Sequence, residues 1–561
     1  MSKVWMKKPI EMMMRDSEQG GLKRTLGATS LVLLGIGAII GAGLFVRTAS
    51  ASAEAAGPAV TISFMVAAIG CAFAGLCYAE FASMFPISGS AYAYAYTTMG
   101  ELVAWIIGWA LIMEYALGAA TVSIAWSEYL NNLLKVLGSN PIPYEWCHSP
   151  FEKLYSIAEA HTYNSVIAYF QAIPADIVEG KAVAFPVPAV SEGLLYLSDK
   201  QFEKLPANMH GLVHTQSGVM NAPALSILLA LTLLLIRGTK ESAVVNGIIV
   251  FIKVAIVLVF IAVGFQFING ANYEPYTIPA GTPGHEGFFQ HGWGGIFRGA
   301  AIVFFAFIGF DAVSTAAQEA KNPKRDMPIG ILGSLVVCTI LYILFAHVLT
   351  GVANWSDFAD PTKGKEASVA YAIQEYMHGY GWLAKCITIA ILAGFSSVIL
   401  VMLMGQSRVF FSMSNDGLIP KVFSALHPKF RTPYKSNWIL FLFVGLFAAF
   451  VPGSVAGDLT SFGTLLAFVL VCLGILVLRK TNPGIVRPFK TPWVPLVPLL
   501  GMLVCMFMII SLDHVTLGVA LIWMVIGLAI YFGYSRYHSK IRNNKNADMS
   551  TMDRDEVRRV E

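Results

Sequence analysis

The sequence predicts an all-α membrane protein with twelve transmembrane helices. Hydrophobic residues make up 56% of the 561 residues and charged residues only 13%, about half the charged share of soluble globular chains. The apolar residues also gather in runs of about 20, the length that a helix needs to cross a bilayer. These observations exclude a soluble protein of this size and indicate that lipid surrounds most of the chain.

Twelve apolar runs have the length and composition of membrane spans. They lie near 28–48, 57–82, 98–130, 219–237, 244–268, 294–318, 328–353, 381–412, 437–452, 458–478, 491–512 and 515–535. Only a short segment with Pro452 and Gly453 separates the ninth run from the tenth. An even number of spans predicts that both chain ends lie on one side of the membrane.

The positions of Lys and Arg orient these spans. Six precede the first span, three lie between the sixth and seventh, four lie between the tenth and eleventh, and seven follow the last. The connections after the fifth, ninth and eleventh spans hold none. Because Lys and Arg accumulate in cytoplasmic loops, we expect a plasma-membrane protein with both termini in the cytoplasm.

The connection at 131–218 is far longer than the usual loop and is expected on the extracytoplasmic side. A small cap, an assembly surface and a partly ordered insertion all remain open for it. We therefore divide the chain into a cytoplasmic N-terminal tail (1–27), a ten-helix core with this insertion (28–478), helices 11 and 12 (479–535) and a cytoplasmic C-terminal tail (536–561).

Several classes of function find no support. A net charge of +4 is too small for a nucleic-acid partner, and the seven cysteines form no CxxC motif or Cys/His cluster, so neither a disulfide framework nor a metal site is expected. We find no ATP-binding GxxxxGK[ST] motif and no hydrolase arrangement. We therefore expect no enzyme, no catalytic residues and no cofactor, and the sequence does not indicate an oligomeric state.

Two spans carry glycine interruptions at equivalent places in two groups of five helices. The first contains GIGAIIGAGLF at 35–45, and the sixth contains FFAFIGFD at 304–311 after glycines at 294, 295 and 299. Each glycine weakens a helix by about 1 kcal/mol relative to alanine, although the same spacing also suits close helix packing. Paired interruptions of this kind indicate an inverted-repeat transporter with a substrate site at the middle of the membrane.

Several long motifs resemble those of the amino acid-polyamine-organocation (APC) superfamily, and most closely its cationic amino acid transporter family. Besides the glycine segments, they are YAEFASMFPISGSAYAY (78–94), EYALGAATVSIAWS (114–127), IKVAIVLVFI (252–261), FFAFIGFDAVSTAAQEAKNPKRDMPIGI (304–331) and GQSRVFFSMSNDGLIPKVFSALHPKFRTP (405–433). The resemblance implies a five-plus-five inverted repeat in helices 1 to 10, broken helices 1 and 6, and alternating access around a central amino acid site.

The resemblance also implies where an amino acid would bind. The backbone amides of Ala42 and Gly43 would receive its carboxylate at the positive end of a helix dipole. Its ammonium would meet carbonyls freed at the two breaks, those of Ile39, Phe305, Ala306 and Ile308. Many family members have Thr where this chain has Ala42, so one hydroxyl contact is missing here while the backbone amide remains.

Lys253 lies inside the fifth apolar run, where an ammonium costs roughly 2.5–3.5 kcal/mol. By resemblance it matches a lysine that stands where sodium binds in sodium-coupled relatives, between helix 1 and helix 8. We expect either a protonatable cation that couples proton transfer to transport, or a fixed structural cation bonded to carbonyls.

Two acids also lie inside apolar spans, where acids need partners. Glu114 on helix 3 could carry a proton, sense the charge of a substrate side chain or hold helix 3 against a neighbour. Asp311 on helix 6 could form part of a gate, pair with the basic connection that follows or contact the substrate. Phe395 and Ser396 on helix 8, with Ser397, fall where the family has its side-chain pocket, although a Phe in a membrane helix commonly only packs.

These features predict a secondary active transporter that takes up L-amino acids with protons. Its partners would be the amino acid, protons and the lipid bilayer. An amino acid exchanger is the alternative within this class, and a non-transporting amino acid sensor is the alternative outside it. A channel is disfavoured because the polar groups form one centre rather than a continuous row. Whether the substrate is cationic or neutral does not follow from the sequence.

Overall fold

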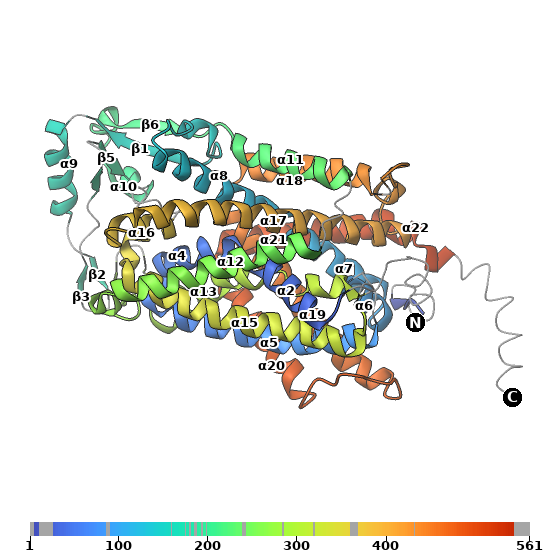
Figure 1. Ribbon diagram of the computed structural model, residues 1–561. Helices are drawn as coiled ribbons and strands as arrows, with labels where there is room; N and C mark the ends of the chain where they lie inside the picture. The colour runs from blue at the N-terminus through green and yellow to red at the C-terminus, as the bar shows by residue number, and fades with distance from the viewer. Residues whose placement is uncertain are drawn as a thin grey trace, which may run out of the picture.

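The computed structural model describes residues 5–9, 26–85, 90–158, 160–173, 176–178, 181–183, 188–191, 194–197, 199–237, 243–282, 285, 287–317, 320–359, 368–430 and 432–543. Long helices run side by side in one bundle, and short strands gather at one end of it (Figure 1). The two described end segments, 5–9 and 536–543, meet at Asp416, since Lys8 Nζ binds its carboxylate and the amide of Lys540 binds its carbonyl. Both ends of the described chain therefore lie together.

Among the described residues, seven helices are long and apolar enough to cross a membrane. They are Arg47–Met84, Glu101–Val136, Val250–Phe267, Pro323–Val352, Gly381–Asn415, Gly453–Thr481 and His514–His538. Five shorter apolar helices accompany them, namely Ala28–Ile39, Ala222–Arg237, Gly292–Phe307, Tyr434–Phe450 and Leu496–Ile510. Every apolar run of the sequence thus coincides with helical structure.

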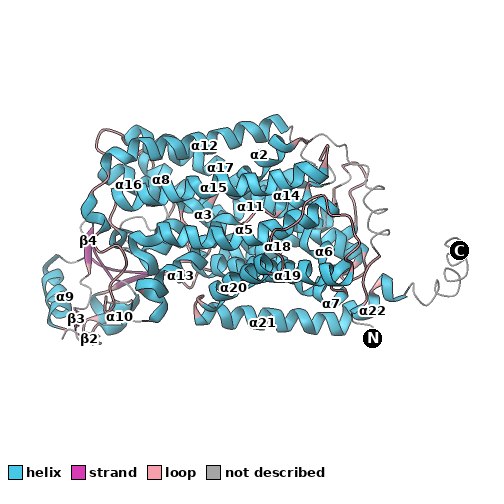
Figure 2. Ribbon diagram, turned by 90° about the horizontal axis from the view of Figure 1, so that it is seen from below, coloured by secondary structure: helices cyan, strands magenta, loops and turns pink. Residues whose placement is uncertain are grey.

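Figures 1 and 2 together label the helices of the bundle. They are α2 (Ala28–Ile39), α3 (Ala42–Phe45), α4 (Arg47–Ala51), α5 (Val60–Met84), α6 (Ser90–Thr98), α7 (Glu101–Ile112), α8 (Gly118–Val136), α11 (Ala222–Arg237), α12 (Ala243–Gly264), α13 (Gly292–Val303), α14 (Ala312–Thr315), α15 (Pro323–Val352), α16 (Ser368–Tyr376), α17 (Gly381–Asn415), α18 (Tyr434–Phe450), α19 (Gly453–Thr481), α20 (Leu496–Ile510), α21 (His514–Ile530) and α22 (Arg536–His538).

The outer surface of the bundle is apolar. Phe251 on α12, Leu503 on α20 and Leu521 on α21 are all largely exposed, whereas one continuous cluster of apolar side chains fills the interior. Soluble monomers rarely expose wide apolar surfaces of this kind. The surface therefore agrees with a protein that spans a membrane.

Two helices are interrupted near their middle. α2 ends at Ile39 and α3 begins at Ala42, while α13 passes into a 3₁₀ turn at Phe304–Phe307. Gly309 follows this turn with a φ of +110°, a backbone conformation that glycine adopts far more easily than other residues. Because these turns lie inside the bundle, protein groups rather than lipid must satisfy their backbone.

The insertion between α8 and α11 contains strands, which an all-α fold does not include. They are β1 (Lys153–Ile157), β2 (Asp176–Val178), β3 (Lys181–Val183), β4 (Ala189–Ser191), β5 (Leu194–Leu197) and β6 (His214–Ser217), together with α9 (Ala160–Ala172) and α10 (Asp199–Lys204). β4, β5, β1 and β6 form an antiparallel sheet in this order, in which Tyr155 lies opposite Leu197 and Thr215. Tyr155, Phe170 and Leu195 belong to a separate small core.

Figure 2 shows the strands outside the helical bundle, so the insertion is a small folded unit. Strands of three to five residues are too short for their alternation to stand out in a sequence.

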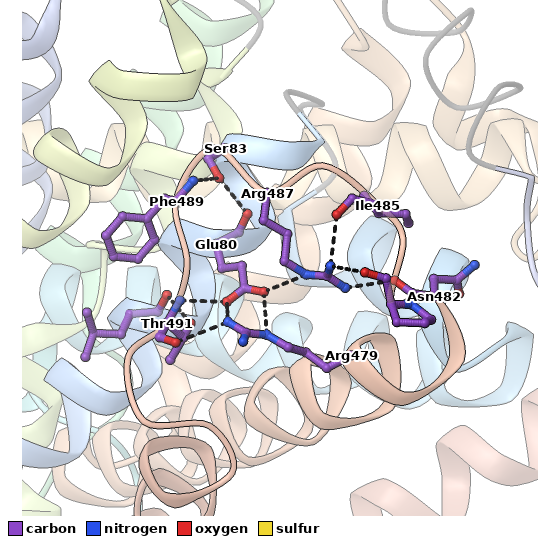
Figure 3. A network of polar contacts seen from close by, with 10 residues as sticks. Glu80, Ser83, Arg479, Asn482, Ile485, Arg487, Phe489 and Thr491 are labelled. Carbon is purple, nitrogen blue, oxygen red and sulfur yellow. Dashed lines mark hydrogen bonds and ion pairs between the residues drawn. The ribbon is translucent and has the colours of Figure 1, made fainter.

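Glu80 joins the last turns of α5 to the connection between α19 and α20 (Figure 3). Its buried carboxylate receives two hydrogen bonds from Arg479 at 3.1 and 2.7 Å and one from the amide of Thr491 at 2.7 Å. Arg487 Nε lies 3.3 Å from the same carboxylate, and its other nitrogens bind carbonyls within the connection. One buried acid therefore holds the folded connection against α5.

Candidate functional site

The side chain of Lys253 on α12 lies at the break between α2 and α3, which interrupts the first predicted span. The last carbonyls of a helix have no donor within that helix, and Lys253 Nζ donates to two carbonyls at this end, Gly37 O at 2.9 Å and Ile40 O at 3.1 Å. It also donates to Ser397 Oγ on α17 at 3.0 Å. Gly394 makes room for this side chain, because a Cβ there would lie 3.1 Å from Lys253 Cε. The ammonium thus joins α12, α2 and α17 inside the bundle.

The two interrupted helices touch each other at backbone level. A Cβ on Gly43 would lie 2.2 Å from the Cα of Ala306 and 2.6 Å from its nitrogen, so only glycine fits at position 43. The amides of Ala42 and Gly43 begin α3, and amides of a first helical turn have no acceptor within their helix. On the other side of the contact, within the 3₁₀ turn that follows α13, the amide of Ile308 donates to Phe305 O at 3.3 Å. The backbone groups expected around a substrate therefore lie around one contact.

Tyr342 on α15 bridges the two breaks. Its hydroxyl lies 2.9 Å from Ile39 O and 2.9 Å from Ala306 O. The side chain is fully buried, and its ring packs against Phe64 and Phe307 with centroid distances of 5.5 and 5.3 Å. Tyr342 was not among the site residues predicted from the sequence, although its hydroxyl in the middle of an apolar run is a usable signal.

Glu114 and Asp311 lie close together inside the bundle. A π-helical turn at Met113–Leu117 between α7 and α8 contains both Glu114 and Tyr115, and such turns are frequent at functional sites. Tyr115 donates to Asp311 Oδ2 at 2.6 Å, while Glu114 lies beside Asp311 and Thr464. Because Lys253 binds α2 and α17 instead, the three charged residues form two groups rather than one.

The three residues predicted to line a side-chain pocket, Phe395, Ser396 and Ser397, lie on α17 and differ in what they contact. Phe395 packs against Phe45, which follows the break in helix 1, and against Tyr129, with centroid distances of 6.2 and 5.5 Å. Ser396 donates to Leu392 O in its own helix at 2.9 Å, whereas Ser397 binds Lys253. Ser397 rather than Ser396 therefore reaches the break.

A buried ion triad joins α4, α13 and α19. Asp458 at the start of α19 binds Arg47 on α4 and also Arg298 on α13, the latter at 2.7 Å. Arg298 and Asp458 lie 160 residues apart in the sequence. The roles of Arg47 and Asp458 do not follow from the sequence, because a single sequence does not show which distant charges meet.

Comparisons with known proteins agree with this architecture. Residues 26–532 match the family described as amino acid permease. The chain is 42% identical over 539 residues to the branched-chain amino acid permease BcaP of Bacillus subtilis (strain 168), covering 96% of this chain and 99% of the relative. It is 36% identical over 541 residues to the methylthioribose transporter of the same organism, with 96% and 99% coverage.

More distant relatives include the vacuolar cationic amino acid transporter 4 of Arabidopsis thaliana. It is 30% identical over 463 residues, which cover 82% of this chain and 64% of that protein. The family match and the two Bacillus subtilis matches extend over the broken helices, the insertion and the remaining helices. The proteins named are transporters rather than enzymes. The chain belongs to the amino acid permease family of the APC superfamily.

Proposed function

We propose that this permease is a proton-coupled importer of L-amino acids that works by alternating access. Its twelve spans would comprise a ten-helix core at 28–478 with a five-plus-five inverted repeat, followed by helices 11 and 12 at 479–535. The tails at 1–27 and 536–561 would lie in the cytoplasm and the insertion at 131–218 outside the cell. The helical interruptions at α2–α3 and α13–α14 support this arrangement, because inverted-repeat transporters bind substrates between such breaks.

The proposed substrate site uses backbone groups for the amino acid itself. Amides of Ala42 and Gly43 would bind the carboxylate. Carbonyls of Ile39, Phe305, Ala306 and Ile308 would bind the ammonium. The apolar rings of Phe45 and Phe395, which pack together beside the break, favour an uncharged side chain. We therefore propose branched-chain amino acids as the first substrate class, which the name of the 42% identical relative also supports.

The observation that carries proton coupling is the position of Lys253. Two carbonyls at the end of α2 and a hydroxyl of α17 hold this ammonium. The ammonium therefore occupies a site where a metal cation would find oxygen ligands. Loss of its proton would remove the charge that holds these groups together. Protonation would then control the position of helix 1.

Glu114 and Asp311 are proposed to take part in the same coupling or to meet the charge of a substrate. Both side chains are fully buried, and two adjacent carboxylates in a dry interior repel each other when both are ionised. In this proposal the two acids share one proton. Substrate binding would then change how that proton is shared.

A second candidate substrate is methylthioribose, because the 36% identical relative is named as its transporter over the same length. This molecule has neither an ammonium nor a carboxylate, so only its uncharged hydroxyls could pair with the backbone amides and carbonyls of the breaks. Uptake competition between L-leucine and methylthioribose separates the two substrates.

Uptake into proteoliposomes tests the proposal. Labelled L-leucine, L-alanine and L-arginine are offered with an inward proton gradient, with and without a protonophore, to the unaltered protein and to Lys253→Ala. Lys385→Ala is the matched control, because Lys385 lies at the exposed start of α17. We expect protonophore-sensitive accumulation of L-leucine that only Lys253→Ala abolishes.

Other outcomes would contradict parts of this proposal. Counterflow that needs no proton gradient and survives in Lys253→Ala would identify an exchanger with a structural lysine. Binding of L-leucine without any flux would identify a sensor.

A further inference from the structure

The Tyr342 hydroxyl has one hydrogen to donate but lies within hydrogen-bond distance of two carbonyl acceptors. A tyrosine carries a single O–H donor, yet the Ile39 and Ala306 carbonyls lie at the same distance of 2.9 Å from it. At any moment one of these carbonyls therefore lacks the hydrogen. Neither carbonyl is as well satisfied as it would be by a group with several donors.

An α-ammonium group is such a donor. It carries three N–H bonds and a positive charge, and charge-assisted hydrogen bonds are roughly twice as strong as neutral ones. The neighbouring carbonyls of Gly37 and Ile40 already bind Lys253. The acceptors that remain for an incoming ammonium at the contact of the two breaks thus include the same two that Tyr342 holds.

We propose that Tyr342 is a positioning residue whose hydroxyl takes the place of the substrate ammonium in the empty protein. The inference rests on the proposed binding of amino acids at the two breaks. While the site is empty, Tyr342 ties α2 and the 3₁₀ turn at Phe304–Phe307 to α15. When the ammonium binds Ile39 O and Ala306 O, it displaces the hydroxyl and releases this tie. Substrate binding would then free the broken helices to move relative to α15.

Competition of this kind predicts the sign of a mutational effect. Tyr342→Phe keeps the ring between Phe64 and Phe307 but removes the competing hydroxyl. Because a hydrogen bond contributes about 0.5–1.5 kcal/mol, we expect the Kd for L-leucine to fall about two- to tenfold. A hydroxyl that only oriented the carbonyls, or only stabilised the fold, would produce a higher or unchanged Kd.

The experiment measures Kd by ligand-induced thermal shift and by equilibrium binding on purified full-length protein. L-Leucine is compared with 4-methylpentanoate, which lacks the ammonium but keeps the carboxylate and side chain. Tyr273→Phe is the matched control, because Tyr273 also donates to an α15 carbonyl, that of His347 at 2.8 Å, away from the breaks. Thermal unfolding without ligand shows that each variant is folded.

We expect Tyr342→Phe to bind L-leucine more tightly while 4-methylpentanoate binding stays unchanged, and Tyr273→Phe to match the unaltered protein. An unchanged or higher Kd for L-leucine would overturn the inference, as would equal tightening for both ligands. If L-leucine did not bind the unaltered protein at all, that result would overturn the proposed function and, with it, the role of Tyr342. The two failures can therefore be distinguished.

Discussion

The contact between the two breaks depends on the absence of a side chain at Gly43. A methyl group there would overlap the backbone of Ala306, with a Cβ–Cα distance of 2.2 Å, and neither backbone can move as a flexible side chain can. We expect Gly43→Ala to separate the breaks and to lower amino acid uptake in proteoliposomes by about tenfold or more, since displacements of about 1 Å at a binding centre have effects of this size.

Gly518→Ala provides the control for this substitution. A Cβ on Gly518 in α21 meets nothing within 4 Å, so this variant should transport normally at equal protein amounts. Normal uptake by Gly43→Ala would show that the breaks are not held at the separation seen here.

The Asp458 carboxylate is shared by two guanidinium groups, which makes the three members of the ion triad unequal. Asp458→Asn would remove the charge that both Arg47 and Arg298 bind, whereas Arg298→Gln leaves the Arg47–Asp458 pair intact. Breaking a buried pair costs about 3–5 kcal/mol. We therefore expect Asp458→Asn to lower the thermal unfolding temperature in detergent clearly more than Arg298→Gln. Equal losses would contradict this reading of the triad.

At the scale of elements, the connection between α19 and α20 depends on an acid from another helix. Glu80→Gln would remove the charge that Arg479 and Arg487 share (Figure 3). Because locally unfolded segments are the ones that proteases cleave, we expect trypsin to cut after Lys490 about tenfold faster in inside-out vesicles. Glu375→Gln, which alters an exposed glutamate on α16, should leave the cleavage rate unchanged. An equal rate in Glu80→Gln would show that this carboxylate does not hold the connection.

The elements differ in how far the sequence predicts them. The positions of the long helices follow from apolar runs because a bilayer dictates both their length and their composition. The interruptions follow from glycine clusters, for the same conformational reason that gives Gly309 its φ of +110°. The side-chain contacts that join the elements cannot be predicted from the sequence. Tyr342 meets Ile39 across 303 residues and Arg47 meets Asp458 across 411, and a single sequence carries no record of such pairs.

For the whole molecule, the number of membrane crossings decides where the two ends lie. The five shorter helices have 12 to 17 residues, or roughly 18–26 Å at 1.5 Å per residue, somewhat less than the ~30 Å of a hydrocarbon core. Bilayer thinning and non-helical residues buried in protein can make up such a difference at modest cost. We therefore expect these helices to cross the membrane together with the longer ones, which gives an even number of crossings.

Protease accessibility of epitope tags in intact cells tests this topology. Tags are fused before Met1, after Glu561 and, in the insertion, after the exposed Asn208. Twelve crossings with cytoplasmic ends predict that external protease removes only the tag in the insertion, and that all three are removed once the cells are permeabilised. If only the seven longer helices crossed, an odd number would place the two terminal tags on opposite sides, and external protease would remove one of them.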